Sequence, residues 1–202
     1  MDYSYEKLAI EKGFTTICGI DEAGRGPLAG PVYAAAVILP LDLEIDGLND
    51  SKKLTEKKRE ALFDVICEKA VSYSIGIATE QEIDKINILN ATFLAMRRAV
   101  DGLSVKPDYA LIDGNQHPGL QIADETVVKG DGKSMSIAAA SILAKVSRDR
   151  FMLEIADKYP EYCFEKHKGY GTKFHYEMIE KYGISPVHRR SFLKKILGDS
   201  NG

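Results

Sequence analysis

Cysteine is scarce in this sequence, and its few cysteines are not placed for a disulfide or zinc framework. The 202 residues contain Cys18, Cys67 and Cys163, which are far apart, and no Cys-x-x-Cys pair. An odd number of dispersed thiols is typical neither of a secreted disulfide-rich domain nor of a zinc site. We therefore expect a cytoplasmic protein.

Long apolar segments are missing as well. No run of about 18 apolar residues occurs, so we expect no membrane-spanning helix. The N-terminal residues are polar and lack the pattern of a secretory signal. With 45% hydrophobic residues the chain can nevertheless bury a core. Its length suits one substantial domain with a small C-terminal extension.

Two common active-site motifs are absent. Residues 130–134 read Gly-Asp-Gly-Lys-Ser, between an expected strand and an expected helix, as in the phosphate-binding loop of nucleoside triphosphatases. That loop also needs a glycine at position 127, where this chain has Val127, so this interpretation is excluded. No Gly-x-Ser-x-Gly sequence occurs, and nothing supports a serine hydrolase.

The net charge of −3 argues by itself against nucleic acid as a partner, but the basic residues are unevenly distributed. Residues 166–195 contain eight Lys or Arg against two acids, and a second basic cluster comprises Lys52, Lys53, Lys57, Lys58 and Arg59. A basic face next to an acidic site fits a protein that binds a phosphate backbone. Either cluster alone is more typical of a solvated helix face.

Residues 17–32 are the stretch around which the rest of the chain is organised. An apolar run ends in Asp21 and Glu22, and Gly24, Arg25 and Gly26 follow. Two carboxylates at the end of a strand are costly unless a cation neutralises them, and a hard divalent metal prefers such oxygen ligands. Glycines let a ligand approach the main chain closely. For this stretch alone, a Gly/Pro turn with two solvated acids is the alternative.

The remaining pattern predicts an α/β fold. We expect a short helix within residues 1–13, strands at 17–21, 32–39, 71–78, 108–112 and 125–128, and helices at 55–70, 79–102, 134–159 and 172–183. Ser185-Pro186 is expected to open a last basic helix. This order predicts a mixed sheet, antiparallel at its start and parallel later, with helices covering it.

Carboxylates follow three of these strands, at Asp21-Glu22, Asp113 and Asp131. If the strands are roughly parallel neighbours, the four acids meet at one edge of the sheet, where ligands bind. Four carboxylates repel one another without cations, which predicts two divalent ions that act on a phosphodiester. Taken singly, Asp113 also fits an Asp-Gly turn and Asp131 a helix cap.

These motifs, in their order, closely resemble those of ribonuclease HII, the type 2 bacterial ribonuclease H family. The matches run from about residue 17 to 192 without a departure at a motif position, and they comprise Asp21–Val32, Asp50–Leu54, Ile112–Asn115, Lys129–Asp131, Ala138–Asp149, His167–Thr172 and His188–Phe192. The resemblance implies a ribonuclease-H-like mixed five-stranded sheet flanked by helices, with a small C-terminal helical part. Residues 1–160 are then the catalytic domain and residues 161–202 a basic, substrate-binding extension.

The resemblance also implies roles for individual residues. Asp21, Glu22, Asp113 and Asp131 correspond to the catalytic acids that bind two Mn²⁺ or Mg²⁺ ions. Gly24, Arg25 and Gly26 match the loop that reads the ribose 2′-hydroxyl, and Tyr170 matches a tyrosine that stacks on the sugar just after the cleaved position. Phosphate contacts are expected from Ser51, Lys52, Arg189 and Arg190.

The implied activity is that of a metal-dependent endonuclease. It hydrolyses the RNA strand of RNA–DNA hybrids and cuts 5′ of single ribonucleotides in duplex DNA, leaving 5′-phosphate and 3′-hydroxyl ends. Arg25 and the chain length favour type 2 over the related type 3 enzymes. Two alternatives stay open: another two-metal nuclease or nucleotidyl transferase of the same superfamily, and a catalytically silent nucleic-acid binder. Hybrid and ribonucleotide-containing duplexes are the expected partners, and no membrane is.

Overall fold

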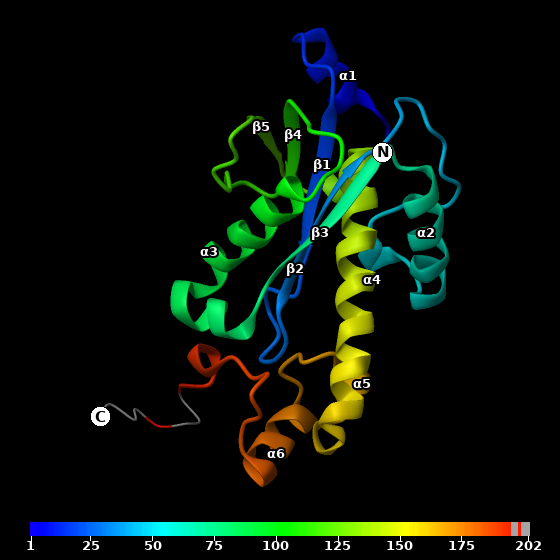
Figure 1. Ribbon diagram of the computed structural model, residues 1–202. Helices are drawn as coiled ribbons and strands as arrows, with labels where there is room; N and C mark the ends of the chain where they lie inside the picture. The colour runs from blue at the N-terminus through cyan, green and yellow to red at the C-terminus, as the bar shows by residue number, and fades with distance from the viewer. Residues whose placement is uncertain (195–197, 199–202) are drawn as a thin grey trace.

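A mixed five-stranded sheet forms the centre of the molecule. The computed structural model describes residues 1–194 and 198. The strands are β1 (Ile17–Ala23), β2 (Val32–Ile38), β3 (Ser72–Ala78), β4 (Tyr109–Asp113) and β5 (Ala123–Val127), and their order across the sheet is β3-β2-β1-β4-β5 (Figure 1). β1 pairs antiparallel with β2 and parallel with β4, and β4 pairs parallel with β5. The predicted mixed sheet is confirmed.

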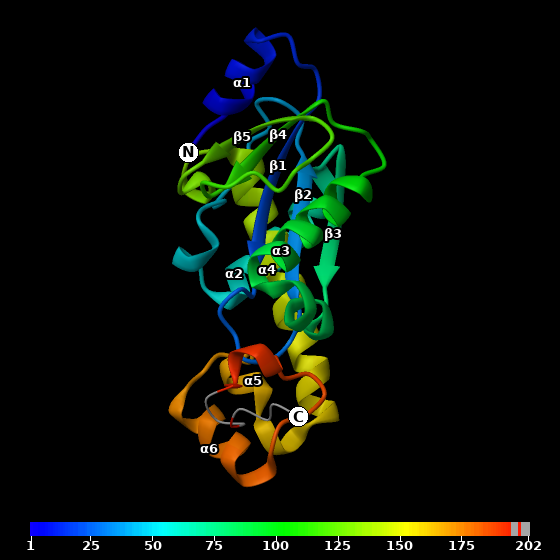
Figure 2. The same cartoon turned by 90° about the vertical axis from the view of Figure 1, so that its left-hand side faces the viewer.

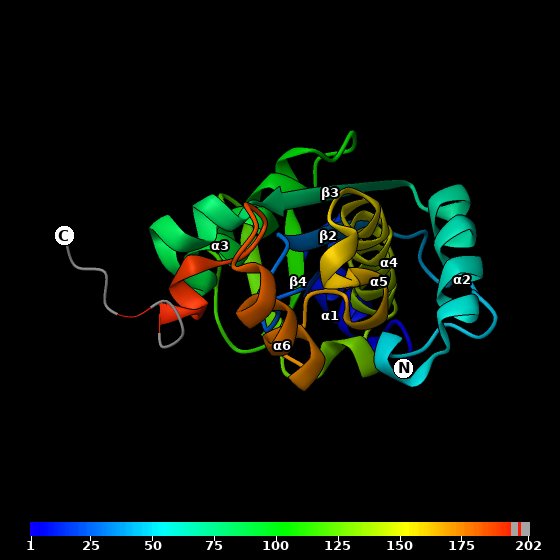
Figure 3. The same ribbon diagram turned by 90° about the horizontal axis from the view of Figure 1, so that it is seen from below.

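Helices cover both faces of this sheet. α3 (Glu80–Asp101) packs on β2 and β3, and the long α4 (Met135–Lys158) packs on β1 and β2 from the other side. α2 (Glu56–Lys69) lies outside α4, as the view from below shows (Figure 3). A Cβ atom on Gly19 of β1 would lie 2.1 Å from the backbone carbonyl carbon of Ser136, so only glycine allows α4 this close to the sheet.

The ends of several helices agree with their predicted caps. Thr79 and Glu82 form a complete capping box at the start of α3. Thr55 caps α2 through the backbone amide of Lys58, and Thr172 caps α6 (Lys173–Tyr182) through the amide of His175. α1 (Ser4–Glu11) is the predicted N-terminal helix. Among the described residues, no helix is long and apolar enough to cross a membrane.

The segment after α4 folds back beneath the sheet. It contains the 3₁₀ turns η3 (Pro160–Tyr162) and η4 (Arg190–Phe192), the short α5 (Phe164–His167), and α6 (Figure 2). Tyr162, Phe164 and Ile179 pack together with Met152 of α4 and with Leu28 from the β1–β2 connection. The segment is therefore anchored to both the long helix and the central hairpin.

Two local features differ from the sequence-based expectations. No helix begins at Ser185-Pro186, because tertiary partners take the backbone groups there: Gly30 N donates to Val187 O, and Arg189 N donates to Leu28 O. Residues 186–187 form a turn instead, and His188 forms an isolated β-bridge with Ala29. In addition, Asn87 interrupts α3 with a φ of 67° and a ψ of 166°, a kink that the apolar pattern did not predict.

Candidate functional site

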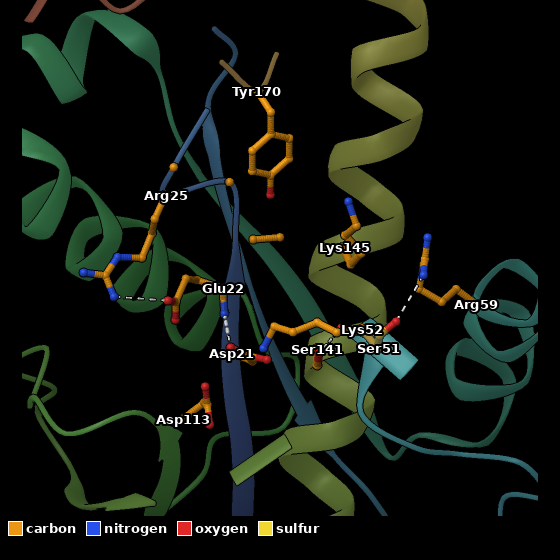
Figure 4. A pocket seen from close by; sticks show the side chains of 13 residues that line it. Asp21, Glu22, Arg25, Ser51, Lys52, Arg59, Asp113, Ser141, Lys145 and Tyr170 are labelled. Carbon is orange, nitrogen blue, oxygen red and sulfur yellow. Dashed lines mark hydrogen bonds and ion pairs between the residues drawn. The ribbon is translucent and has the colours of Figure 1, made fainter. Parts of the chain in front are cut away.

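Parallel pairing of β1 and β4 brings the predicted acids to one place. Ile20 pairs with Ile112, so Asp21 and Asp113 directly follow a matched pair at the carboxyl ends of neighbouring strands. Asp131 lies in η2 (Gly130–Gly132), just beyond β5. A cavity of about 280 Å³ opens here, and Figure 4 shows its lining; it comprises Asp21, Glu22, Ala23, Gly24, Arg25, Gly26, Ser51, Lys52, Arg59, Asp113, Ser141, Lys145 and Tyr170.

Asp21 and Asp131 are buried, Glu22 and Asp113 are half-buried, and the carboxylates repel one another. Burial, with repulsion from Glu22 and Asp113, raises the pKa of Asp21 well above its usual value. Burial raises the pKa of Asp113 too, and neighbouring Asp131 adds to this effect. The pKa of Glu22 is also raised by burial, although Arg25 opposes the shift. The cluster therefore holds more negative charge than the protein alone stabilises.

Two cationic side chains partly neutralise this cluster. Lys52 Nζ lies 2.9 Å from Asp131 Oδ2, and Arg25 Nη1 lies 3.4 Å from Glu22 Oε1. Asp113 Oδ1 accepts a hydrogen bond of 2.6 Å from the backbone amide of Gly130, which fixes the η2 turn beside it. Within residues 1–194 and 198, no three His, Cys, Asp or Glu side chains are arranged to hold a metal ion as they stand. The oxygen-only donor set and the unbalanced charge nevertheless fit hard divalent cations.

The glycine loop at residues 24–26 lines the same cavity. Gly24 has a φ of 96°, a conformation that L side chains rarely adopt, and an added Cβ would lie 2.2 Å from Arg148 Nε. Gly26 is different: the nearest atom to an added Cβ is Tyr170 Cε1 at 3.8 Å, an ordinary contact. Gly24 is thus required by the fold, whereas Gly26 leaves its face of the loop open to the cavity.

Two buried arginines hold residues 24–31, the connection that contains this loop, and within residues 1–194 neither has a carboxylate partner. Arg148 donates to the carbonyl oxygens of Pro31, Ala29 and Lys168, and Arg189 to those of Gly30, Arg25 and Gly24. Both side chains are fully buried. The expected phosphate contact of Arg189 is therefore wrong, because its guanidinium has no surface free for a ligand. Instead it braces the glycine loop.

Arg148 was not singled out by the sequence reasoning, although a signal was present. It lies four residues after Ala144 and four before Met152, both fully buried, and so on the buried face of α4. An arginine on such a face needs internal acceptors. The pattern of an apolar helix interrupted by one arginine could have indicated a bracing role.

Tyr170 projects toward the cavity from the C-terminal segment, opposite the acids in Figure 4. The residue is 43% exposed, and the guanidinium of Arg148 lies 5.9 Å from the ring centroid. Its backbone is held by the amide-to-carbonyl bond from Tyr170 N to His167 O at 2.8 Å. The ring is therefore free on one side while its main chain is fixed.

Ser51 and Lys52 lie where the resemblance suggests, on the η1 turn (Ser51–Lys53) at the edge of the cavity. Ser51 is buried and its hydroxyl accepts a 2.6 Å hydrogen bond from Ser141, while Lys52 is exposed. Arg59 donates to the carbonyl oxygens of Ser51 and Leu54 and so fixes this turn. Lys145 also lines the cavity and pairs with Asp149 at 2.7 Å; the sequence reasoning did not single it out.

The basic C-terminal segment is only partly a surface feature. Lys166, Lys173, Lys181, Arg190 and Lys194 are exposed, whereas Arg189 is buried. Lys195 lies outside the described residues. Arg190 keeps its side chain at the surface, and its backbone amide donates to Asp84. A phosphate contact from Arg190 stays a prediction.

Sequence comparison gives a consistent family match. The family model described as Ribonuclease HII matches residues 18–195. A relative named Ribonuclease HII from Clostridioides difficile (strain 630) is 58% identical over 193 residues, covering 96% of this chain and 76% of its own length. Another Ribonuclease HII, from Caldicellulosiruptor bescii, is 55% identical over 195 residues, covering 96% of this chain and 95% of the relative.

Solved structures resemble this fold as well. The crystal structure of the ribonuclease H2 from Pyrococcus horikoshii OT3 superposes with a TM-score of 0.73 at 29% identity, covering 88% of this chain and 93% of that one. The ribonuclease HII in a complex with PCNA from Archaeoglobus fulgidus gives a TM-score of 0.67 at 25% identity, covering 87% and 94%.

Proposed function

The chain belongs to the ribonuclease HII family, and from this premise we propose that it cuts RNA–DNA hybrids and single ribonucleotides embedded in duplex DNA. The proposed cut lies 5′ of the ribonucleotide and leaves 5′-phosphate and 3′-hydroxyl ends. Family membership makes the chain a metal-dependent endoribonuclease. The single ribonucleotide as a substrate, the position of the cut and the roles of individual residues are the proposed parts.

One observation carries the proposal: three of the four acids and the groups proposed to read a ribose line a single cavity. Asp21, Glu22 and Asp113 line it together with Gly26 and Tyr170. A phosphodiester held against the acids would place its sugar beside the open face of Gly26. The only group that distinguishes ribose from deoxyribose is the 2′-hydroxyl, which both donates and accepts hydrogen bonds.

Asp21, Glu22, Asp113 and Asp131 are the proposed ligands for divalent metal, either Mg²⁺ or Mn²⁺. Two such ions, when bound, would supply the charge that activates a water and stabilises the leaving oxygen of the phosphodiester. The raised pKa of Asp21 supports this assignment, because that carboxylate gains most from a nearby cation. Lys52, whose ammonium contacts Asp131, is close enough to shift from the acid to a substrate phosphate.

The remaining roles follow from the geometry of each side chain. The backbone of residues 24–26 is proposed to contact the 2′-hydroxyl, since no Cβ at Gly26 obstructs the approach. Arg25 is exposed and can clamp the adjacent phosphate. Tyr170 is proposed to stack on the following sugar. Residues 1–160 and 161–202 are proposed as catalytic domain and basic extension, and a cytoplasmic location remains a prediction.

The test uses three matched duplexes: all DNA, DNA with one ribonucleotide, and an RNA–DNA hybrid. Each is incubated with Mg²⁺, with Mn²⁺ and with chelator. We expect cleavage of the last two substrates in metal only, and end analysis should find 5′-phosphate and 3′-hydroxyl groups. Binding of the hybrid without any cleavage in either metal would instead make the chain a catalytically silent binder. Cleavage of the hybrid alone would remove the single-ribonucleotide part of the proposal.

A further inference from the structure

Three histidines form one buried cluster beneath the sheet, and the proposed function uses none of them. His167, His175 and His188 are 8%, 0% and 2% exposed. The rings of His167 and His175 stack with their centroids 4.3 Å apart. The ring of Phe164 lies against all three, at centroid distances of 5.8, 5.5 and 5.7 Å. The cluster is therefore enclosed by apolar surface, where a charged imidazole is unfavourable.

The hydrogen bonds of His175 and His188 assign their tautomers. His175 Nδ1 lies 2.9 Å from the carbonyl oxygen of Tyr170, an acceptor, so this nitrogen carries the proton. His175 Nε2 then accepts, and its partner at 3.0 Å is His188 Nε2, which must donate. His188 Nδ1 is left to accept, and the backbone amide of Ser185 donates to it at 2.9 Å. Both rings are neutral, and the bond between them fixes the tautomer of each.

His167 completes the cluster from the other side. Its Nε2 lies 2.9 Å from the carbonyl oxygen of Tyr162 and donates to it. Its Nδ1 accepts a 3.2 Å bond from the backbone amide of Gly169. All six ring nitrogens of the three histidines thus have partners, and in each ring one nitrogen accepts a hydrogen bond, which only the neutral ring can do. Such a fully paired buried network fixes one arrangement of the groups it touches.

These bonds converge on the main chain of Tyr170. Its amide donates to His167 O at 2.8 Å, and its carbonyl accepts from the ring of His175 and from the amide of Thr172. The two preceding residues have positive φ, 49° at Lys168 and 85° at Gly169. A lysine in this region is strained and persists only when its surroundings hold it. The Tyr170 loop is held by the histidines, and its ring alone is free.

We propose that the three histidines are positioning residues that act through Tyr170, by fixing the backbone from which its ring reaches the nucleic-acid sugar. His175 makes the direct contact, and His188 sets its tautomer by donating to Nε2. This inference rests on the proposed function for the part that Tyr170 plays. None of the three histidines lines the cavity itself; their link to it is the bond from His175 to the backbone of Tyr170.

The first test needs no substrate. The chain contains no tryptophan, so Tyr170→Trp places a single fluorescent reporter on the loop. In this background His175→Phe keeps a ring but removes the donor to the carbonyl of residue 170. His175→Asn keeps a donor near the position of Nδ1. We expect His175→Phe to lower the anisotropy of the tryptophan and shift its emission to the red, and His175→Asn to restore both. Unchanged emission and anisotropy in His175→Phe would overturn the proposal.

The second test asks whether the effect passes through the tyrosine. On a duplex with one ribonucleotide, His175→Phe should lower kcat/KM by about 10- to 100-fold, since loss of positioning by roughly 1 Å has that effect. In a Tyr170→Ala background the same substitution should cause no further loss. Losses that multiply would show that His175 acts independently of Tyr170. If the wild type does not cut this duplex, the proposed function fails. The fluorescence test still shows whether the histidines fix the backbone at residue 170.

A matched pair at His188 covers the case in which His175→Phe does not fold. His188→Gln keeps a donor near the position of Nε2, whereas His188→Asn keeps an acceptor near Nδ1 and has no donor that reaches the position of Nε2. Circular dichroism establishes folding of each variant. In the Tyr170→Trp background we expect the Gln variant to keep the tryptophan anisotropy and emission of the parent. The Asn variant should lower the anisotropy and shift the emission to the red. The opposite order would contradict the proposed chain of contacts from His188 to Tyr170.

Discussion

The guanidinium of Arg189 donates a hydrogen bond of 2.6 Å from Nη2 to the carbonyl oxygen of Gly24, 165 residues earlier in the chain. The other two nitrogens of the same group donate to Gly30 and Arg25. The C-terminal segment therefore shapes the loop that is proposed to read the ribose. Burial lowers the pKa of Arg189 to about 9, a cost that its carbonyl contacts offset.

Arg189→Lys should disturb this loop although the charge is kept. A lysine ammonium cannot span three separate carbonyls as a planar guanidinium does. We expect the free energy of unfolding in urea to fall by about 3 kcal/mol, since hydrogen bonds from charged groups contribute roughly 1.5–3 kcal/mol each. The control is Arg190→Lys at the exposed neighbouring position. This substitution should change the free energy of unfolding by less than about 0.5 kcal/mol. Equal stability of both variants would remove the bracing role.

The same pair of positions separates bracing from phosphate binding. Arg190→Ala should reduce the slope of log binding constant against log salt by about 0.9, as expected for one lost phosphate contact. In Arg189→Lys the slope should stay at the wild-type value, because a buried side chain releases no counterions. An unchanged slope in Arg190→Ala would assign that residue to the solvated surface.

Asp21→Asn should abolish cleavage and stabilise the metal-free protein. The pKa of Asp21 is raised on folding, so its contribution to stability is present below the unfolded value of 3.8 and is lost as pH rises through the folded value. At neutral pH the ionised carboxylate thus destabilises the fold, and an amide does not. We expect a higher unfolding temperature in chelator and a loss of at least about 10²-fold in cleavage rate.

Metal provides the matching control for Asp21. Mg²⁺ or Mn²⁺ should raise the unfolding temperature of the wild type by binding the folded state, and should raise that of Asp21→Asn much less. Asp46→Asn, at an exposed position outside the cavity, should resemble the wild type in both assays. Wild-type cleavage by Asp21→Asn at saturating metal would exclude this acid as a ligand.

Acid should destabilise the fold through the buried histidines. Burial lowers the pKa of His175 and of His188 from 6.5 to about 4. Because both folded values are depressed, the unfolded chain binds more protons, and stability present above pH 6.5 is lost as pH falls toward 4. The loss should be on the order of a few kcal/mol for the two together. Urea unfolding at pH 7, 6 and 5 in the Asp21→Asn background measures it, since Asp21 acts in the opposite direction. A free energy of unfolding that stays constant from pH 7 to pH 5 would contradict this prediction.

Much of the fold was predictable because local and tertiary preferences agree. The alternation of apolar runs with capped helices indicated the mixed sheet, and Thr79 with Glu82 marked the start of α3. The region after Ser185 was not predictable in this way. Its backbone groups bond to Leu28 and Gly30, and periodicity carries no information about such distant partners. The kink at Asn87 was missed because the helical pattern of apolar residues continues on both sides of it, so the sequence gives no local signal of a break.

The site shows the same division. Carboxylates at strand ends predicted that Asp21 and Asp113 would lie together, because parallel pairing follows from the order of elements. The burial of Arg189 was not predictable from a run of basic residues, which looks the same whether its members are exposed or buried. The six arginine contacts to carbonyl oxygens depend on the path of the loop, which the fold alone determines.

Tyr170 should contribute through its ring more than through its hydroxyl. Tyr170→Phe keeps a flat ring for stacking on a sugar, whereas Tyr170→Ala removes it. On a duplex with one ribonucleotide we expect the Phe variant to stay within about tenfold of the wild type and the Ala variant to lose about 10²-fold. The exposed Tyr176→Ala on α6, outside the cavity lining, is the control. Wild-type cleavage by Tyr170→Ala would remove this side chain from the mechanism.

Gly24 and Gly26 offer the sharpest separation of folding from recognition. An alanine at Gly24 would meet Arg148 at 2.2 Å in a backbone conformation with φ of 96°, so Gly24→Ala should destabilise the fold. An alanine at Gly26 would meet only Tyr170 at 3.8 Å, so Gly26→Ala should unfold at the same urea concentration as the wild type.

Gly26→Ala should nevertheless fail to cut a single embedded ribonucleotide. The added methyl group occupies the open face of the loop, where the proposed contact with the 2′-hydroxyl requires bare backbone. We expect a loss of about 10²-fold in kcat/KM, as for a displacement of roughly 1 Å at a reacting centre. Binding of an all-DNA duplex, which has no 2′-hydroxyl to exclude, should change little. Wild-type cleavage by a normally folded Gly26→Ala would mean that the protein recognises the sugar elsewhere. Of the proposed site, only the role of the acids would then remain.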